Sequence, residues 1–482
     1  MMNDTFSGMV RPTLQLLSED HIDAIHRYST RILAETGIRV ESKEALEIFS
    51  RSDAVRIEDH VVFIQKEMVD ECIDLAPSNI EVFDKQGKHA FHLGQKQGKD
   101  THFGIGVTNT YFQNIESGEV ELFTRKHMQE ATSLGDLLDN YAMVSTPGVL
   151  SDVPVAASDL YASLDMYANT DKPLVLLIAG EGKINSVLDL LSSLHGDLGS
   201  RPFCIPYVNP ITPLVLNKET SDKMIATLGR GLPLMYSNYG MYGGSTPVKE
   251  GGTLALLNAE LLAGLVFSQL IRAGSQVILG SLPAAFNMSS MGSYYTPTTY
   301  LLNLACAEMM NHYQVPHCGT SGSNNGRGAD LPASEDLWIN HLSSCLGKIA
   351  CAPFVGGNLE SLAFSPSTVV LSDHIIGEAK KFARGFSLDD ESVNLDDIAR
   401  VGHGGDYFTS EQTLASLDEL GKVKALWPPL SLGDWKAQGM PTAAMELTET
   451  TLNLYAKARE ATRERKELIK EGEHLIKNLI PS

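Results

Sequence analysis

At 482 residues the chain is long enough for a barrel of about 250 residues with additions, or for two or three smaller domains. With 43% hydrophobic and 20% charged residues it has the composition of a globular protein. Its formal net charge of −21 argues against nucleic acid and anionic membranes as partners and favours a cationic ligand.

The six cysteines have no spacing typical of a disulfide framework or a metal site. None forms a CxxC pair, none lies at zinc spacing from a histidine, and HExxH is absent. The chain begins without a basic segment followed by an apolar one, and the apolar stretch 254–270 is interrupted by polar side chains. We therefore expect a cytoplasmic protein with reduced cysteines, no metal site and no membrane span.

Residues 1–100 predict a small α+β cap. A helix begins at Ser18 and stops at Gly37, and a short helix, a strand at 61–64 and a helix at 67–75 follow. Glycine turns in the segments 87–94 and 114–123 indicate two β-hairpins.

From residue 101 short apolar runs alternate with helical patterns. The predicted strands are 102–107, 142–145, 174–179, 203–208, 232–237, 276–281, 315–320 and 351–356. The predicted helices between them are 124–139, 156–169, 182–194, 218–229, 251–273, 298–313 and 330–348. Eight strands alternating with helices indicate a parallel sheet, and a (β/α)8 barrel over residues 101–366 is its simplest closed form. The alternative is an open doubly wound sheet, but no GxGxxG follows the first strand.

Residues 367–482 predict a helical extension that packs on the barrel or on a second subunit. Its first helix, about 367–384, ends with basic residues near the negative end of the helix dipole. A glycine-rich loop follows at 402–408, and the last predicted helix spans 442–479.

The stretch PHCGTSGSNNGRGAD at 316–330 joins the seventh predicted strand to a helix through four glycines. Glycines let backbone N–H groups approach a ligand, Arg327 could clamp a carboxylate, and Asp330 could supply a negative field or cap the helix. The alternative is a flexible connection with an N-capping aspartate. The stretch is not a Walker A loop.

In a barrel the ligand lies at the carboxyl ends of the strands, so the residues after each predicted strand are the candidates. Those we select for substrate binding are Phe103, Tyr207, Asn209, Tyr236, Tyr239, Phe286, Gly319, Thr320, Arg327, Asp330, Phe354 and Asn358, and Glu360 also falls at this rim. The set is poor in acid–base groups, and we expect His317 and His403 to be structural. Aromatic rings suit a cation, with plain packing as the alternative.

Five segments resemble, in the right order, the trimethylamine:corrinoid protein methyltransferase family. They are LAETGIRVESKEALEIF at 33–49, LAPSNIEVFD at 75–84, NPITPL at 209–214, GGSTPVKEGGTLAL at 243–256 and VGHGGDYFTSEQT at 401–413. The resemblance implies a (β/α)8 barrel that moves a methyl group from a methylated amine to the Co(I) of a corrinoid carried by a separate protein. It also implies a homo-oligomer.

One departure from the family concerns the loop after the seventh strand. The trimethylamine enzymes carry pyrrolysine there, and this chain has only standard residues. It therefore resembles the demethylases of quaternary amines such as glycine betaine, proline betaine and carnitine. Their nitrogen already carries the charge that makes it a leaving group, so catalysis requires positioning and no acid or base. Arg327 and the backbone of 319–328 would hold the carboxylate, with Asp330 or Asp406 nearby.

Two alternatives remain open on the sequence. One is a methyltransferase that uses a tertiary amine or another donor, such as a methylated pterin. The other is a non-enzymatic betaine-binding protein on the same barrel.

Overall fold

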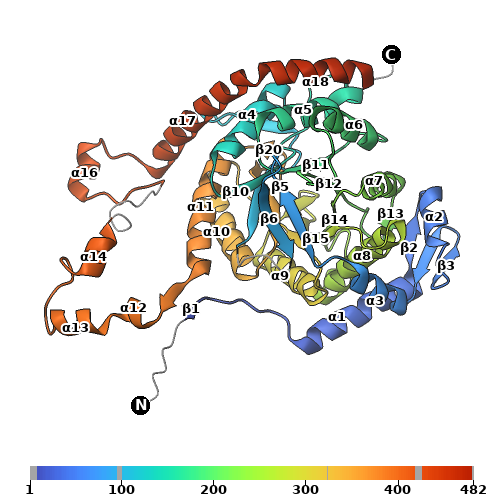
Figure 1. Ribbon diagram of the computed structural model, residues 1–482, viewed down its shortest axis with the longest axis horizontal. Helices are drawn as coiled ribbons and strands as arrows, with labels where there is room; N and C mark the ends of the chain where they lie inside the picture. Colours follow the sequence, from blue (N-terminus) through green and yellow to red (C-terminus); the bar gives the residue numbers. More distant parts are fainter. Residues whose placement is uncertain (1–7, 95–99, 323, 418–425, 480–482) are drawn as a thin grey trace.

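The computed structural model describes residues 8–94, 100–322, 324–417 and 426–479, and at its centre is a closed barrel of eight parallel strands (Figure 1). Each strand pairs in parallel with the next, and the eighth pairs with the first. In chain order they are β7 (His102–Ile105), β10 (Tyr141–Ser145), β11 (Leu174–Leu177), β12 (Cys204–Val208), β14 (Leu234–Tyr242), β15 (Val277–Asn287), β17 (His317–Gly319) and β18 (Cys351–Val355). The predicted (β/α)8 barrel is confirmed, and the open sheet is excluded because no strand of the ring lacks a neighbour.

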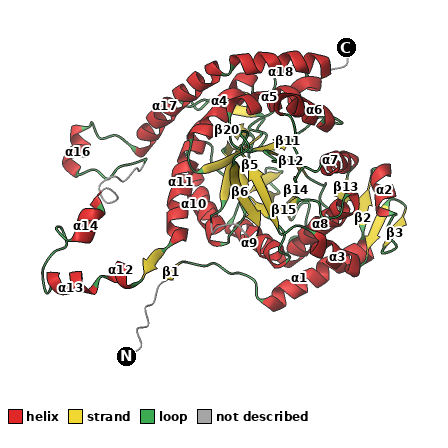
Figure 2. Cartoon of the chain, in the orientation of Figure 1, coloured by secondary structure: helices red, strands yellow, loops and turns green. Residues whose placement is uncertain are grey.

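A layer of helices surrounds the barrel (Figure 2). It consists of α4 (Arg125–Leu137), α5 (Ser158–Asn169), α6 (Ile184–His195), α7 (Lys218–Gly229), α8 (Glu250–Ile271), α9 (Pro297–His312), α10 (Leu331–Leu346) and α11 (Pro366–Arg384). Helix α8 is long and apolar enough to cross a membrane, but 89% of its most apolar window is buried inside the protein. It is therefore the central helix of this layer, which explains why it is apolar on all sides.

Alternate residues of each strand face the barrel interior or the helices, as the two-residue period of a strand requires. Met143, Ile205 and Met235 share an interior cluster. Phe103 and Val144 belong to the core between strands and helices. Both faces of the strands are therefore buried, which is why they read as continuous apolar runs.

A β-hairpin closes the amino-terminal end of the barrel. Strands β5 (Asn79–Phe83) and β6 (His89–Gly94) pair antiparallel and lie in front of the barrel strands in Figure 1. Val82 and Phe91 join the interior cluster, and the N–H of Phe83 donates to the carbonyl of Pro202, just before β12. Because this end is plugged by side chains, a ligand must enter from the carboxyl ends of the strands.

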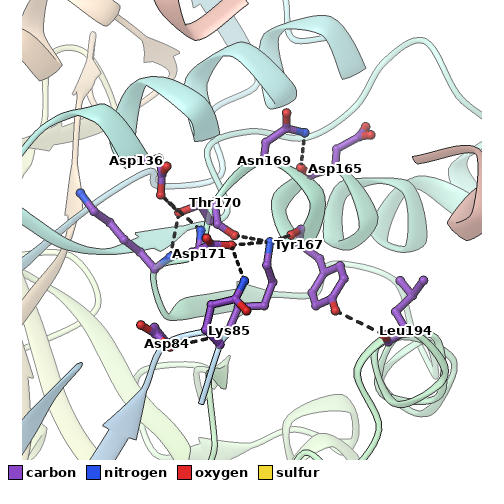
Figure 3. Close-up of polar contacts among 11 residues, drawn as sticks. Asp84, Lys85, Asp136, Asp165, Tyr167, Asn169, Thr170, Asp171 and Leu194 are labelled. Carbon is purple, nitrogen blue, oxygen red and sulfur yellow. Dashed lines mark hydrogen bonds and ion pairs between the residues drawn. The ribbon is translucent and has the colours of Figure 1, made fainter. Parts of the chain in front are cut away.

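Two lysines fasten this end to the helix layer, and Figure 3 shows the contacts of one of them, Lys85. Lys85 Nζ donates to the carbonyls of Tyr167 and Thr170 at the end of α5, each at 2.7 Å, and pairs with Asp171 at 3.0 Å. Lys172 Nζ likewise donates to Gly135 and Leu138 at the end of α4, at 2.8 and 2.7 Å. Each lysine thus satisfies carbonyls that a helix end leaves without partners, at the negative end of its dipole.

The remaining amino-terminal elements pack on α8. They are α1 (Glu19–Arg31), β2 (Ile38–Val40), α2 (Lys43–Phe49), β3 (Val55–Glu58), β4 (Val61–Ile64) and α3 (Lys66–Leu75). Strand β2 pairs with β13 (Val215–Leu216) from the loop after β12, which joins these elements to the barrel. The second predicted hairpin is β8 (Tyr111–Gln113) with β9 (Val120–Leu122).

The carboxyl-terminal helices lie along the barrel wall. The segment predicted as one helix is divided near Arg465 into α17 (Ala443–Glu464) and α18 (Lys466–Leu479), which cover α4, α5 and α6 (Figure 1). Arg125 of α4 joins this packing by pairing with Asp165 at 2.8 Å and with Glu473 at 2.7 Å.

Between α11 and α17 part of the chain projects away from the barrel (Figure 1). This segment, called the arm, comprises residues 386–417 and contains β21 (Phe386–Leu388), α12 (Asp390–Val393), α13 (Leu395–Val401) and α14 (Glu411–Ala415). Strand β21 pairs antiparallel with β1 (Gly8–Val10). A further short helix, α16 (Leu432–Ala437), precedes α17.

Candidate active site

A cavity of about 210 Å³ lies at the carboxyl ends of the barrel strands. Its walls come from strands β14, β15 and β18, from the segments that follow β7, β17 and β18, and from the loop before α9. The lining residues are Val107, Tyr239, Leu282, Tyr295, Thr320, Phe354, Glu360 and Ser361. Three are aromatic, and one, Glu360, carries a charge.

A larger cavity of about 1130 Å³ lies outside the barrel, between α1 and the first turns of α8 and α9. Its walls are mostly aliphatic and include no strand end. Because ligands of (β/α)8 enzymes lie at the carboxyl ends of the strands, we assign the active site to the smaller cavity.

Tyr239 of β14 supplies one of the three rings of the cavity wall. It faces Leu282 of the neighbouring strand in register, and both side chains line the site. Burial raises the pKa of Tyr239, while hydrogen bonds with Ser293 and Tyr295 act against that rise. The hydroxyl is therefore protonated at neutral pH and held by its neighbours.

Phe354 forms the opposite part of the wall. Its ring meets the edge of Tyr207 at a centroid distance of 5.1 Å, so Tyr207 supports it from the barrel interior. Burial raises the pKa of Tyr207, which excludes a phenolate there. Aromatic faces in such an enclosure attract a cation through the ring quadrupole.

Glu360 is placed by an unusual backbone. Leu359, Glu360 and Ser361 have φ values of 53°, 60° and 62°, three consecutive left-handed residues with side chains. Each such residue costs about 1 to 2 kcal/mol, so the surrounding contacts must impose this conformation. Leu359 N–H donates to the Gly326 carbonyl at 3.0 Å, and Asn109 Nδ2 donates to the Ser361 carbonyl at 2.7 Å.

The carboxylate of Glu360 is held as well. Its Oε2 accepts from the backbone N–H of Ser293 at 3.2 Å. The side chain is exposed, so the cavity reaches the surface at this residue. The strained segment thus places one carboxylate beside three rings. Packing alone does not require such strain, so this feature points to a function.

The glycine-rich loop is ordered by its own polar side chains. Asp330 Oδ1 and Oδ2 accept from the N–H groups of Ala333 and Arg327, at 3.0 and 2.9 Å. Asp336 Oδ2 accepts from the N–H of Asn325 at 2.8 Å. Asn324 Oδ1 accepts from Gly326 N–H at 2.8 Å. Asp330 is thus the N-cap of α10, which was one of the two roles that the sequence left open.

The structure brings three of the predicted residues into the cavity, namely Tyr239, Thr320 and Phe354. Tyr207 lies directly behind them, and Gly319 is the last residue of β17. A side chain at Gly319 would lie 2.7 Å from Asn303 Oδ1, so this glycine allows close packing of β17 on α9.

Two predicted aromatic residues face the helix layer instead. Phe103 lies 5.3 Å from the His341 ring, and Tyr236 packs against Gly264 of α8. Asn358 is buried and hydrogen bonded to Gln113 and Thr368, at 3.1 and 2.9 Å.

Four other predicted residues are not among those that line the cavity. Asn209 and Arg327 are exposed, and Phe286 packs near Gly244. Asp406 is exposed in the arm, between α13 and α14.

The selection missed Glu360, Tyr295, Val107, Leu282 and Ser361. The position of Glu360 just after the eighth strand made it a possible candidate. Its left-handed backbone could not be predicted from the sequence. Tyr295 lies in the loop before α9. The only hint in the sequence is that it follows another tyrosine, Tyr294.

The histidines do not supply a base to this cavity. His317 is buried in β17, and desolvation lowers its pKa to about 4, so it is neutral at neutral pH. His403 is exposed in the arm. Within the described part of the chain, no group of three His, Cys, Asp or Glu residues could hold a metal ion.

The fold and the cavity define a (β/α)8 enzyme with a small aromatic site at the barrel mouth. A profile of the family described as trimethylamine methyltransferase (MTTB) matches residues 4–466. The chain therefore belongs to this family and is a methyltransferase, and the resemblance noted in the sequence is confirmed.

Characterised relatives match most of the chain. Trimethylamine methyltransferase MttB of Desulfitobacterium hafniense (strain DSM 10664 / DCB-2) is 26% identical over 83% of this chain and 81% of its own. Glycine betaine methyltransferase of Desulfitobacterium hafniense (strain Y51) is 24% identical over 84% and 85%. The crystal structure of the Methanosarcina barkeri monomethylamine methyltransferase (MtmB) aligns with a TM-score of 0.56 at 10% identity, covering 94% of this chain and 89% of that one. This likeness shows the shared fold.

Proposed function

We propose that this methyltransferase takes a methyl group from a quaternary ammonium compound and passes it to the Co(I) of a corrinoid carried by a separate protein, releasing the tertiary amine. The observation that supports the proposal is the composition of the cavity. Three rings and one carboxylate surround a space large enough for a small organic cation, and no acid–base pair accompanies them. The proposed location of this methyl transfer is the cytoplasm.

This composition matches the chemistry of the step. The acceptor cobalt uses its electron pair to form a bond to the methyl carbon, while the carbon–nitrogen bond breaks and its electrons stay on nitrogen. The amine leaves as a neutral molecule, so no proton must be moved. The protein's task is to hold one methyl group toward the cavity mouth and to exclude water around the cation.

The strength of cation binding is limited by the same chemistry. The positive charge on nitrogen disappears as the bond breaks, so contacts that favour the cation favour the substrate more than the transition state. Each ring contributes only about 0.5 to 2 kcal/mol. Moderate binding of this kind keeps the transfer barrier low.

The test follows cobalt directly. The purified protein is mixed with a Co(I) corrinoid protein and, in separate reactions, glycine betaine, carnitine, choline, tetramethylammonium or trimethylamine, and methyl-Co(III) is followed by its absorbance. Methylation by a quaternary amine is the expected result. Methylation by trimethylamine alone would favour the tertiary-amine alternative, and binding without any methylation would favour the non-enzymatic alternative.

A homo-oligomer is part of the proposal. In the arm, Leu395 is 71% exposed and Phe408 is 79% exposed, and short helices with uncovered apolar residues gain little stability alone. Strand β1 pairs with β21 of the arm, and the chain then runs to Leu16 and Leu17, which line the large outer cavity. These exposed apolar residues suit contact with a second copy of the chain. Analytical ultracentrifugation should give a dimer or larger species, and Phe408→Ser should weaken it; a monomeric wild type would contradict this.

A further inference from the structure

We infer that the ammonium compound carries no carboxylate, and that Glu360 imposes this preference. The site would accept a cation with a neutral tail, of the choline or tetraalkylammonium class, rather than a zwitterionic betaine. The inference rests on the proposed function and narrows its substrate.

The charge of the cavity points this way. Glu360 is the one charged side chain among its eight lining residues, and no Lys, Arg or His is among them. A betaine carboxylate is covalently tied close to the nitrogen, so within about 210 Å³ it would lie near the Glu360 carboxylate. Like charges at such separations in a partly enclosed site weaken binding by about tenfold or more.

Arg327, the residue that the sequence predicts to hold a carboxylate, lies outside the lining of the cavity. Arg327 is exposed and does not line the cavity. Its backbone is fixed at both polar groups, since the N–H donates to Asp330 at 2.9 Å and the carbonyl accepts from Gln113 Nε2 at 2.7 Å. The loop that carries Arg327 is therefore anchored, and Arg327 is exposed on it.

Much of the described backbone of the glycine-rich loop is already hydrogen bonded within the chain. Four of its N–H groups already donate to side chains of this chain, at 2.8 to 3.2 Å. The donors are Thr320 to Asn303, Asn325 to Asp336, Gly326 to Asn324 and Arg327 to Asp330. An anion site built from backbone N–H groups needs several of them free and convergent. These four N–H groups are therefore not available to bind a carboxylate.

The left-handed turn shows that the negative charge is built into the site. A mobile surface glutamate could turn away from a zwitterion, but Glu360 sits within three strained residues whose backbone is held from two sides. The Ser293 N–H fixes the carboxylate itself. These contacts hold the carboxylate beside the residues that line the cavity.

The test is calorimetric binding to the full chain without a corrinoid protein. Choline and tetramethylammonium are compared with glycine betaine and carnitine. We expect the first two to bind about tenfold or more tightly than the last two. Glu360→Gln should weaken choline binding and narrow the difference between the classes. The matched control is Glu116→Gln, an exposed carboxylate on the turn between β8 and β9, which should leave both classes unchanged.

The outcomes separate the two claims. If betaines bind as tightly as choline, the inference is wrong and the proposed function still stands. The same conclusion follows if Arg327→Gln loses betaine binding. No binding of any quaternary ammonium compound contradicts the proposed function itself, and the inference falls with it. The wild-type comparison needs no variant, and circular dichroism shows whether Glu360→Gln keeps the fold.

Discussion

Tyr239 combines two functions that a single substitution can separate. Its ring lines the cavity, and its hydroxyl is tied to Ser293 and Tyr295. The ring contributes the attraction for a cation, whereas the hydroxyl positions the ring without meeting a reacting atom. Catalysis by positioning predicts that loss of the ring is serious and that loss of the hydroxyl is mild.

We therefore expect Tyr239→Phe to bind choline or tetramethylammonium within about threefold of the wild type. Tyr239→Leu should lose about 0.5 to 2 kcal/mol of binding free energy, or about 2- to 30-fold in affinity. Isothermal titration of the two variants beside the wild type measures this. Equal losses in both variants would show that the hydroxyl, and not the ring face, carries the interaction.

The sequence could predict which residues lie near the carboxyl ends of the strands, but not which way their side chains point. Tyr236 and Tyr239 both belong to a strand that ends at the mouth, yet Tyr236 faces α8 and Tyr239 faces the cavity. A strand buried on both faces carries apolar residues on both of them, so its pattern does not show which residues point inward. Residues three apart in one strand must face opposite sides, and that rule reduces the candidates by half.

Among the elements, two lysines join the hairpin and the neighbouring helix ends at the plugged end of the barrel. Lys85 comes from the hairpin and caps α5, whereas Lys172 comes from the loop after α5 and caps α4. The plug and two neighbouring helices are thereby coupled through buried carbonyl contacts. Desolvation lowers the pKa of both lysines, so these hydrogen bonds form in a poorly hydrated place.

Lys85→Met should therefore lower the free energy of unfolding by about 2 to 3 kcal/mol, because two helix-end carbonyls and Asp171 lose their partner. Chemical denaturation followed by circular dichroism measures the change. Lys88→Met provides the control, since Lys88 is exposed on the same turn and should change stability by no more than about 0.5 kcal/mol. If the two variants behaved alike, the capping role of Lys85 would be refuted.

At the scale of the whole molecule, the alternation of strands and helices made the barrel predictable. Each element shows its own local period, and eight repeats leave few arrangements. The hairpin at 79–94 was predictable as a hairpin, but its place as the plug depends on contacts with Pro202 and the interior cluster. The cavity was the least predictable part, because it joins residues from 107 to 361 through loop conformations that follow no period.

The stability of the whole fold should depend on pH in part through two fully buried histidines. His317 in β17 and His341 in α10 are buried, and desolvation lowers their pKa values to about 4 and about 3. Lys380 also lowers the pKa of His341, and His341 Nδ1 lies 2.7 Å from Ser321 Oγ. In the unfolded chain a histidine takes up its proton near pH 6.5. Between that pH and the folded-state values the unfolded state therefore binds more protons.

Stability is thus fully present above about pH 6.5 and is lost as the pH falls toward 4, by about 3 kcal/mol for each histidine. Melting temperatures measured from pH 7 to pH 4 should decline steeply. His317→Gln removes one of the two groups, so its melting temperature should start lower at pH 7 but fall less over the same range. His403→Gln, an exposed histidine in the arm, should follow the wild-type curve. A His317→Gln curve parallel to the wild type would mean that His317 is protonated in the folded barrel, and that the interior of β17 is better hydrated than its packing indicates.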